Sequence, residues 1–391
     1  MLSIPRYGEA SLAELLPSIL GGMGVADADG RLRLEPAQRV CLLLVDGLGH
    51  ELLERHAEEA PFMAALLPAA RTLDAPFPAS TAVSICTLST GRPPGIHGIT
   101  GYTMSVPGVD GLLQCLSWID YLTGADLTDR ARPESIQRQE PLLVSAAEEG
   151  IATAVVSRID YGGSGLTRTA FHQTRFIGLR DVADAEERIA AISAVLRTTE
   201  RGLVYSYDAR LDAAAHVHGV ASTQWRSALR LIDRLVAALV RSLPKGTRLY
   251  VTGDHGAIDL LPGAAGRVDI AGDVRLRIGV RVLAGEPRAR HVHAERGQAE
   301  AVVERWREAL GQDFLVLARN EAIEAGAFGP TVAPAIRPRI GDVVVIARDR
   351  KGVFDSRLAP AELTLVALHG ALDPAETAVP LLEAECEGPV G

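Results

Sequence analysis

Four short apolar runs set the pattern of the chain. They are Val40 to Val45, Ile151 to Ser157, Gly202 to Tyr207 and Leu249 to Thr252. A continuous apolar run of this length is typical of a strand that is buried on both faces of a parallel sheet. The sequence therefore predicts at least four buried, parallel strands.

Segments with apolar residues at helical spacing separate these strands. They are Ser11 to Leu20, His50 to Leu67, Thr81 to Ser89, Glu140 to Glu149, Ala183 to Arg197 and Thr223 to Leu243. Ser11 and Glu14 have the spacing of a capping box at the start of the first helix. Strands that alternate with helices indicate parallel βαβ units. We expect an α/β fold with a doubly wound, mostly parallel sheet.

The pattern changes after residue 267. The order becomes strand (Val274 to Leu283), helix (Gln298 to Leu310), short strand (Phe314 to Leu317), helix (Glu321 to Ala325) and strand (Asp342 to Ile346). This order predicts a small inserted α+β lobe at 268–361, with residues 1–267 and 362–391 forming the main α/β domain. The segment 102–138 has mixed character and predicts no definite element.

Composition narrows the class of protein. The 391 residues are 47% apolar and 4% aromatic, which is enough for a large, mainly aliphatic core. The net charge of −9 disfavours binding of a nucleic-acid polymer. The four cysteines are widely spaced, so we do not expect a disulfide framework. Cys41 and Cys86 lie in apolar runs, which is typical of buried thiols. The chain shows no signal peptide at Met1 to Arg6 and no long apolar run, so we expect a cytoplasmic protein without a membrane segment; the sequence does not predict its oligomeric state.

Polar residues with metal-binding side chains follow the predicted strands. Asp46 ends the first apolar run, and Asp254 and His255 follow the run at Leu249 to Thr252. Asp212 and His216 stand four residues apart, which places them on one face of a helix. In open parallel sheets, ligands bind outside the carboxyl ends of the strands. Carboxylate and imidazole are both good ligands of Zn²⁺.

Each of these residues has an ordinary structural explanation when taken alone. Asp46 would cap the helix that follows, and a single histidine such as His369 is more often structural. His218 is an alternative to His216, although a helix would turn it away from Asp212.

Thr81 is the candidate nucleophile. Its neighbour Ser80 is the rival, and a Ser-Thr pair is also a routine helix N-cap. Metal coordination would be needed to activate such a hydroxyl, and a helix beginning here would favour a bound phosphate. Ser84 is placed to donate to a phosphate oxygen.

The ordered set resembles the alkaline phosphatase superfamily, most closely its nucleotide pyrophosphatase/phosphodiesterase branch. The family order of Asp, Thr, Asp-x-x-x-His, Asp-His and His appears as Asp46, Thr81, Asp212/His216, Asp254/His255 and His369. The stretch Thr90 to Ile99 is similar to the family's TG-x-x-P-x-x-HG-I segment, and the family's spacing back from Gly91 leads to Thr81 rather than Ser80. The resemblance covers roughly residues 36–265 and 362–391.

The resemblance implies a metal centre and a reaction. One Zn²⁺ would be held by Asp212, His216 and His369, and a second by Asp46, Asp254 and His255, with Thr81 beside it; Mn²⁺ is the alternative metal. Thr81 would attack the phosphorus of a small phosphate ester, a phosphodiester or pyrophosphate, and the phosphothreonine would then be hydrolysed. His97 would be structural.

Two departures limit the substrate. Ala82 stands where the family usually has an aromatic residue that stacks on a nucleobase, and Ser84 stands where it usually has Asn. A nucleotide substrate therefore does not follow, and Tyr102, Trp118 and Tyr121 are hypothesised to line a leaving-group pocket instead.

Three other functions compete. A metal-dependent phosphomonoesterase or phosphomutase of the same superfamily is the alternative, since Asp46-Gly47-Leu48-Gly49 is similar to the start of cofactor-independent phosphoglycerate mutases. A sulfatase is disfavoured because no C/S-x-P-x-R pattern occupies the nucleophile position. All six ligand types and the hydroxyl are present, which argues against a non-catalytic binding protein.

Overall fold

A seven-stranded sheet forms the centre of the protein. The computed structural model describes residues 3–26, 28 and 30–389. Residues 1–2 of the N-terminal stretch considered above lie outside these ranges. In spatial order the strands are β2 (Arg71–Asp74), β18 (Ala378–Glu385), β9 (Thr247–Gly253), β1 (Arg39–Val45), β8 (Gly202–Asp208), β6 (Ala152–Arg158) and β7 (Phe176–Leu179). β18 is antiparallel to both of its neighbours, and the other pairs are parallel. The predicted mostly parallel sheet is confirmed.

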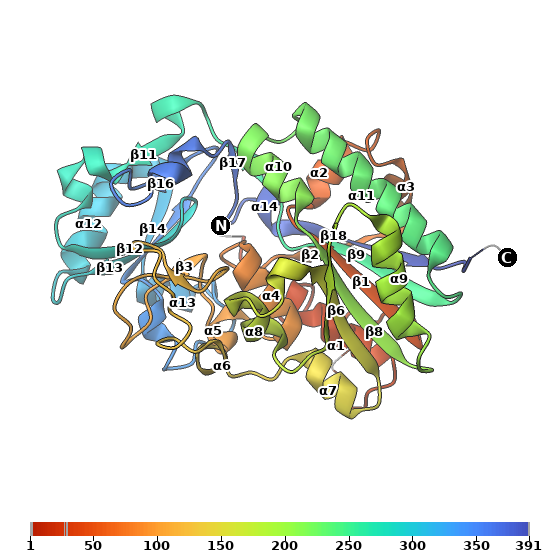
Figure 1. Ribbon diagram of the computed structural model, residues 1–391. Helices are drawn as coiled ribbons and strands as arrows, with labels where there is room; N and C mark the ends of the chain where they lie inside the picture. The colour runs from red at the N-terminus through yellow and green to blue at the C-terminus, as the bar shows by residue number, and fades with distance from the viewer. Residues whose placement is uncertain (1–2, 27, 29, 390–391) are drawn as a thin grey trace.

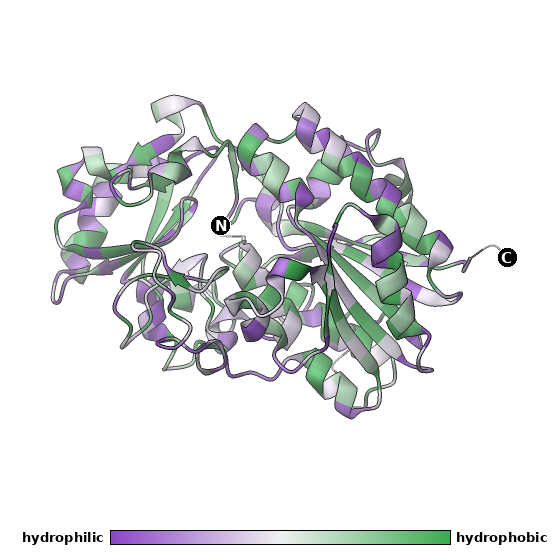
Figure 2. Cartoon of the chain, in the orientation of Figure 1, coloured by the Kyte–Doolittle hydropathy of each residue, from purple (hydrophilic) through white to green (hydrophobic). Residues whose placement is uncertain are grey.

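Helices cover both faces of this sheet (Figure 1). Along β1, Val40, Leu42 and Leu44 enter one hydrophobic core, whereas Cys41, Leu43 and Val45 enter the other. The first core is covered by α1 (Leu15–Gly22), α4 (Thr81–Thr90), α7 (Leu142–Glu148) and α8 (Gly165–Phe171). The second is covered by α2 (His50–Arg55), α3 (Pro61–Leu66), α9 (Ala185–Leu196), α10 (Arg210–His218) and α11 (Thr223–Ser242). The strands of the central sheet are accordingly coloured mainly as hydrophobic in Figure 2. Because helices cover both of its faces, the doubly wound arrangement is confirmed.

A second, antiparallel sheet lies beside the first (Figure 1). Its strands are β12 (Val280–Glu286), β13 (Ala289–Ala294), β15 (Val343–Ala347) and β14 (Phe314–Ala318), and α12 (Ala299–Leu310) and α13 (Arg319–Glu324) pack on it. β11 (Arg267–Asp269) pairs with β16 (Gly352–Phe354) where the chain leaves and rejoins this part. We refer to these elements as the lobe; that 268–361 forms a separate domain stays a prediction.

The segment without predicted elements forms a small sheet of its own. It contains β3 (Thr103–Met104), β4 (Leu113–Gln114), β5 (Ile119–Asp120) and the short helix α6 (Pro133–Ile136). The hydroxyl of Thr103 donates to the carbonyl oxygen of Gly285 at 2.8 Å, which ties this segment to β12.

Several expected boundaries change for identifiable reasons. The helix expected over His50 to Leu67 is two helices, α2 and α3, because Pro61 begins the second and cannot continue the first. The strand expected from Val274 begins only at Val280, after a 3₁₀ turn at Val274–Leu276. The capping box of Ser11 and Glu14 is confirmed, although the first turn it caps is 3₁₀.

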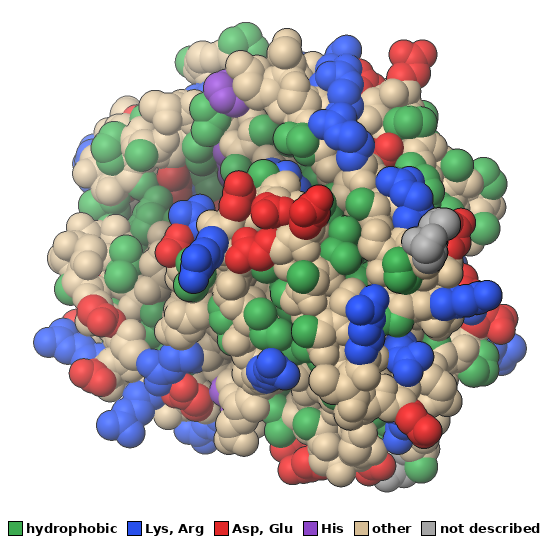
Figure 3. All heavy atoms as spheres, turned by 45° about the vertical axis from the view of Figure 1, so that its right-hand side comes forward, with side chains coloured by type: hydrophobic (Ala, Val, Ile, Leu, Met, Phe, Trp, Pro, Cys, Tyr) green, Lys and Arg blue, Asp and Glu red, His purple; other side chains and the backbone are tan. Residues whose placement is uncertain are grey.

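Three further findings concern the cysteines, the helices and the surface. The four cysteines are free and buried. Within the described ranges, every helix is too short or too polar to cross a membrane. On the face shown in Figure 3, Lys and Arg side chains are interspersed with acidic ones rather than gathered in one broad patch.

Candidate active site

The candidate site lies at the carboxyl edge of the central sheet. Val45 of β1 is level with Gly253 of β9 and with Asp208 of β8, so the three strands end together. Asp46 directly follows β1, Asp254 and His255 follow β9, and α10 after β8 carries Asp212 and His216. His369 follows the short strand β17 (Ala367–Leu368), which pairs with β10 (Ile258–Asp259). The fold thereby gathers residues separated by more than 300 positions.

Asp46, Asp254 and His255 form the first group of potential metal ligands, with one ligand atom of each within 4.8 Å of the others. His255 Nε2 lies 3.4 Å from Asp46 Oδ1 and 3.5 Å from Asp254 Oδ2. The backbone N–H groups of Gly47 and His255 each donate to Asp254 Oδ1 at 3.0 Å, which fixes that carboxylate.

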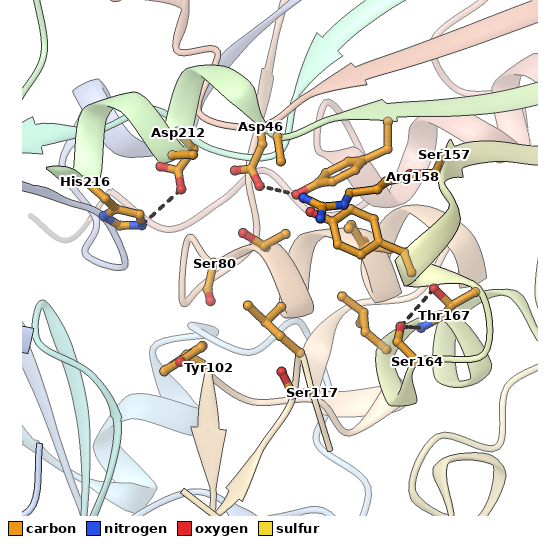
Figure 4. Close-up of a pocket in the computed structure, with 18 of the residues that line it drawn as sticks. Asp46, Ser80, Tyr102, Ser117, Ser157, Arg158, Ser164, Thr167, Asp212 and His216 are labelled. Atoms are coloured by element: carbon orange, nitrogen blue, oxygen red, sulfur yellow. Dashed lines mark hydrogen bonds and ion pairs between the residues drawn. The ribbon is translucent and has the colours of Figure 1, made fainter. Parts of the chain in front are cut away.

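Asp212, His216 and His369 form the second group under the same distance limit. His216 Nε2 lies 3.0 Å from Asp212 Oδ2, the contact drawn in Figure 4. The rings of His255 and His369 stack with centroids 3.5 Å apart, so the two groups adjoin. The structure thus gathers the six residues into the same two sets that the resemblance implies, whereas His218 is exposed on the other side of α10.

The three histidines are all oriented through their Nδ1 atoms. Nδ1 of His216 donates to the carbonyl of Ala367 at 2.8 Å, and Nδ1 of His369 donates to that of Ala79 at 2.7 Å. Nδ1 of His255 donates to the carbonyl of Gly256 at 3.0 Å. In the neutral rings this pattern places the proton on Nδ1 and leaves the Nε2 lone pair facing the site, as in metal-binding histidines.

Three carboxylate oxygens in the site lack hydrogen-bond partners among the described residues. They are Asp46 Oδ1, Asp212 Oδ1 and Asp254 Oδ2, and all are buried. Each unsatisfied buried group of this kind costs about 1–3 kcal/mol, and more if it is charged. Cations bound here would remove that cost, so these residues fit the two metal ions that the resemblance implies.

The electrostatics of the site reflect the crowded negative charge. Burial raises the pKa of Asp46 well above its ordinary value, and the carboxylates of Asp254 and Asp212 add to the effect. Burial likewise raises the pKa of Asp254 to about 6 and lowers that of His255 to about 4. Burial also disfavours the charged ring of His216, but Asp212 outweighs it and raises the pKa of His216 to about 9.

Thr81 lies at the first position of α4, next to the first group. Its hydroxyl is 3.2 Å from His255 Nε2 and, since that atom carries the lone pair, donates to it. Ser80 is the N-cap residue but makes no capping hydrogen bond. The first N–H groups of a ten-residue helix such as α4 favour a bound anion beside Thr81.

Ser84 does not reach the cavity. It is fully buried, and its hydroxyl donates to the carbonyl of Asp254 at 2.7 Å. This contact orients the Asp254 segment and leaves the hydroxyl without a free donor for substrate.

Sequence reasoning missed Tyr207, whose hydroxyl donates to Asp46 Oδ2. The contact arises because β8 pairs with β1, placing Tyr207 level with Leu44.

The segment around His97 makes structural contacts. His97 is buried, and its Nε2 atom forms a hydrogen bond with the hydroxyl of Thr87 at 2.9 Å.

A cavity of about 970 Å³ opens from the candidate site. Figure 4 shows Arg158 and Ser157 at the end of β6, Ser164 at the N-cap of α8, Thr167 on that helix, and Tyr102 on the opposite wall. Tyr121 also lines the cavity, so two of the three aromatic residues hypothesised for a leaving-group pocket lie there. Trp118 does not: it is fully buried, and its Nε1 donates to the carbonyl of Ala131.

Residues 40–371 match the family described as Type I phosphodiesterase / nucleotide pyrophosphatase. The chain belongs to this family. As a member of the phosphodiesterase/nucleotide pyrophosphatase family it also belongs to the alkaline phosphatase superfamily, as its sequence motifs indicate.

Solved structures of similar fold include two ectonucleotide pyrophosphatase/phosphodiesterase 5 proteins and a bacterial phosphonoacetate hydrolase. Murine ectonucleotide pyrophosphatase/phosphodiesterase 5 is 16% identical, with 90% of this chain and 88% of that chain covered and a TM-score of 0.68. The human protein of the same name is also 16% identical, with 90% of this chain and 88% of that chain covered and a TM-score of 0.67. Phosphonoacetate hydrolase from Sinorhizobium meliloti 1021 is 19% identical over 91% of this chain and 92% of that chain, with a TM-score of 0.66. No curated protein sequence matches significantly.

Proposed function

We propose that this family member is a two-zinc hydrolase that cleaves phosphodiester or pyrophosphate bonds through a phosphothreonine intermediate. The observation that carries the proposal is the pair of adjoining three-residue groups with unpartnered carboxylate oxygens, next to a hydroxyl at a helix N-terminus. A hydroxyl nucleophile at neutral pH needs such an environment.

In this proposal the two groups hold the metals. Asp212, His216 and His369 would bind one ion, and Asp46, Asp254 and His255 the other, with Thr81 next to the second. Two Zn²⁺ ions, or Mn²⁺ in their place, would supply Lewis-acid stabilisation of the negative charge on the oxygens around phosphorus. Ser84 and Tyr207 act as positioning residues, since each holds a member of the Asp46 and Asp254 pair in place.

Thr81 carries the covalent step. Its oxygen forms a bond to phosphorus and its proton leaves to solvent, while the bond from phosphorus to the leaving group breaks and its electron pair stays on the leaving oxygen. Water then cleaves the phosphothreonine and regenerates the hydroxyl. The free N–H groups at the start of α4 would hold the non-bridging phosphate oxygens through both steps.

The charges around the cavity favour a diester over a monoester. Of the described residues that line it, Arg158 alone is a lysine or arginine, and its guanidinium already pairs with Asp160 at 2.6 Å. A phosphate monoester carries one more negative charge than a diester and finds no additional free cation here. The alternative, a phosphomonoesterase or phosphomutase, requires that extra charge to be met by the metals alone.

The murine relative has been solved, as an inactive variant, in complex with AMP, and the bacterial phosphonoacetate hydrolase with phosphonoformate. We propose a small phosphate ester as the substrate here, without assigning a nucleotide, because Ala82 offers no stacking surface.

The test is hydrolysis of bis-p-nitrophenyl phosphate and of p-nitrophenyl phosphate by the zinc-loaded protein, before and after chelation. A higher kcat/KM for the diester that disappears on chelation and returns with zinc supports the proposal. A higher value for the monoester supports the alternative, and activity that survives complete metal removal excludes both.

A further inference from the structure

The lobe contributes one carboxylate to the cavity. Glu286 ends β12, at the turn that connects it to β13, and lines the cavity although only 4% of the residue is exposed. It packs against the backbone beside His369: a Cβ added to Gly370 would lie 2.7 Å from Glu286 Cγ. The carboxylate therefore sits next to the second group of potential metal ligands.

Neither oxygen of the Glu286 carboxylate has a hydrogen-bond partner of normal geometry among the described residues. The hydroxyl of Ser80 and the backbone of Tyr102 approach it without completing such bonds. Buried polar atoms are paired in the great majority of cases, so two open acceptors on one cavity wall indicate a missing donor.

A neighbouring carboxylate shows what a satisfied one looks like here. Glu362 lines the same cavity, forms a buried ion pair with Arg290 and accepts a hydrogen bond from the hydroxyl of Tyr121 at 2.8 Å. Arg290 also donates to the carbonyls of Val353 at 2.9 Å and Gly285 at 3.3 Å. The hydrogen bonds of this guanidinium thus go to Glu362 and to backbone carbonyls, and both oxygens of Glu286 stay without a partner among the described residues.

The position of Glu286 is fixed from both sides. Two residues later, Arg288 makes a bidentate ion pair with Glu376 at 2.8 and 2.7 Å, and both side chains are completely buried. One residue earlier, Gly285 adopts a φ of +81° and its carbonyl accepts from Thr103. The hairpin tip is therefore held rigidly against the catalytic side, as a preorganised binding group requires.

We infer that Glu286 is a specificity-determining residue that accepts a hydrogen bond from an ammonium or hydroxyl group on the organic part of the substrate. The inference deepens the proposed function and rests on it, since the phosphate of that substrate is taken to lie at the two metal-binding groups. Among the described residues, the carboxylates of Glu286 and Glu362 face only the one guanidinium of Arg290 in this part of the cavity wall. We therefore expect an ammonium group to bind more tightly than a hydroxyl, and a hydroxyl more tightly than a methyl group.

The test compares three phosphate esters of equal size: ethyl phosphate, 2-hydroxyethyl phosphate and 2-aminoethyl phosphate. Their inhibition constants are measured against bis-p-nitrophenyl phosphate with zinc-loaded protein at pH 8. That pH lies above the pKa of about 7 to which burial raises Glu286. For the wild-type protein we expect 2-aminoethyl phosphate to bind at least tenfold more tightly than ethyl phosphate, with 2-hydroxyethyl phosphate between them.

Two variants separate charge from hydrogen bonding. Glu286→Gln keeps an acceptor oxygen without the charge, so it should lose the preference for the ammonium over the hydroxyl. Glu286→Ala should bind all three compounds equally. Glu324→Gln makes the same change of charge on the exposed side of α13 and should leave the wild-type ranking in place.

Equal constants for the three compounds in the wild-type protein, or a ranking that survives in Glu286→Ala, would overturn the inference. Failure of the proposed function has a different appearance, because bis-p-nitrophenyl phosphate would then not be hydrolysed at all. In that case calorimetric titration of the same compounds still decides: a ranking that depends on Glu286 supports its role, and equal affinities refute it.

Discussion

Asp254→Asn should stabilise the metal-free protein and weaken metal binding. In the metal-free protein, burial raises the pKa of the Asp254 carboxyl from 3.8 to about 6. At 1.36 kcal/mol for each factor of ten, that difference corresponds to about 3 kcal/mol of unfavourable free energy for the charged form. Asparagine removes the charge and keeps an oxygen that accepts from the N–H groups of Gly47 and His255.

The sign of the pH dependence follows from linkage. Because the pKa of Asp254 is higher in the folded than in the unfolded state, the folded protein binds the proton more tightly. The charge costs nothing below about pH 3.8, costs progressively more up to about pH 6, and costs its full amount above that. The gain from Asp254→Asn is therefore about 3 kcal/mol at pH 8 and shrinks toward zero as the pH falls toward 4.

Calorimetric unfolding in the presence of a chelator measures this gain. With about 2.1 cal/mol/K of unfolding entropy per residue, 3 kcal/mol corresponds to a rise of about 4 °C in Tm for a chain of 391 residues. Asp129→Asn, on an exposed turn, makes the same change of charge and should leave Tm unchanged. With zinc present the order should reverse, because the variant binds the metal less tightly and gains less from it. A metal-free variant that is less stable than wild type at pH 8 would refute the electrostatic reasoning.

Three further predictions test single contacts. Thr81→Ala should lower kcat by about a thousandfold or more while the protein keeps its full zinc stoichiometry, measured by metal analysis; a normal kcat would exclude Thr81 as the nucleophile. Tyr207→Phe removes a hydrogen bond to Asp46, a candidate metal ligand, and should weaken zinc binding about 10- to 100-fold in calorimetric titration. Tyr205→Phe is its control, because that buried hydroxyl has no partner among the described residues. Glu376→Gln leaves the buried guanidinium of Arg288 unpaired and should cost about 3–5 kcal/mol in urea unfolding, and an unchanged midpoint would contradict this.

The parts of the fold that the sequence predicted are those with strong local patterns. β1 contains the continuous apolar run Val40 to Val45 and β9 the shorter run Leu249 to Val251, because both faces of these strands are covered, and α11 has a clear amphipathic stripe. β18 escaped prediction because its residues Ala378–Glu385 include a proline and two glutamates, and its place between β2 and β9 depends on pairing with distant segments. Local periodicity carries no information about such pairing.

The candidate site divides in the same way. Asp46, Asp254 and His255 were identified because each follows a predicted strand, and strand ends meet at one edge of a parallel sheet. Tyr207 and Glu286 had no such pattern, since a tyrosine in a strand and a glutamate in a hairpin turn are common everywhere. Their importance comes only from what the tertiary structure places opposite them.

The spread of the candidate ligands along the chain has a consequence for the order of assembly. The first ligand is residue 46 and the last is residue 369, and β18 closes the sheet only after that. During synthesis the strands and helices of the N-terminal half can pack together early. The two groups of candidate metal ligands, however, stay incomplete until nearly the whole chain has been made. Metal uptake would then be a late event that marks a finished molecule, and a truncated chain would have no complete centre with which to compete for zinc.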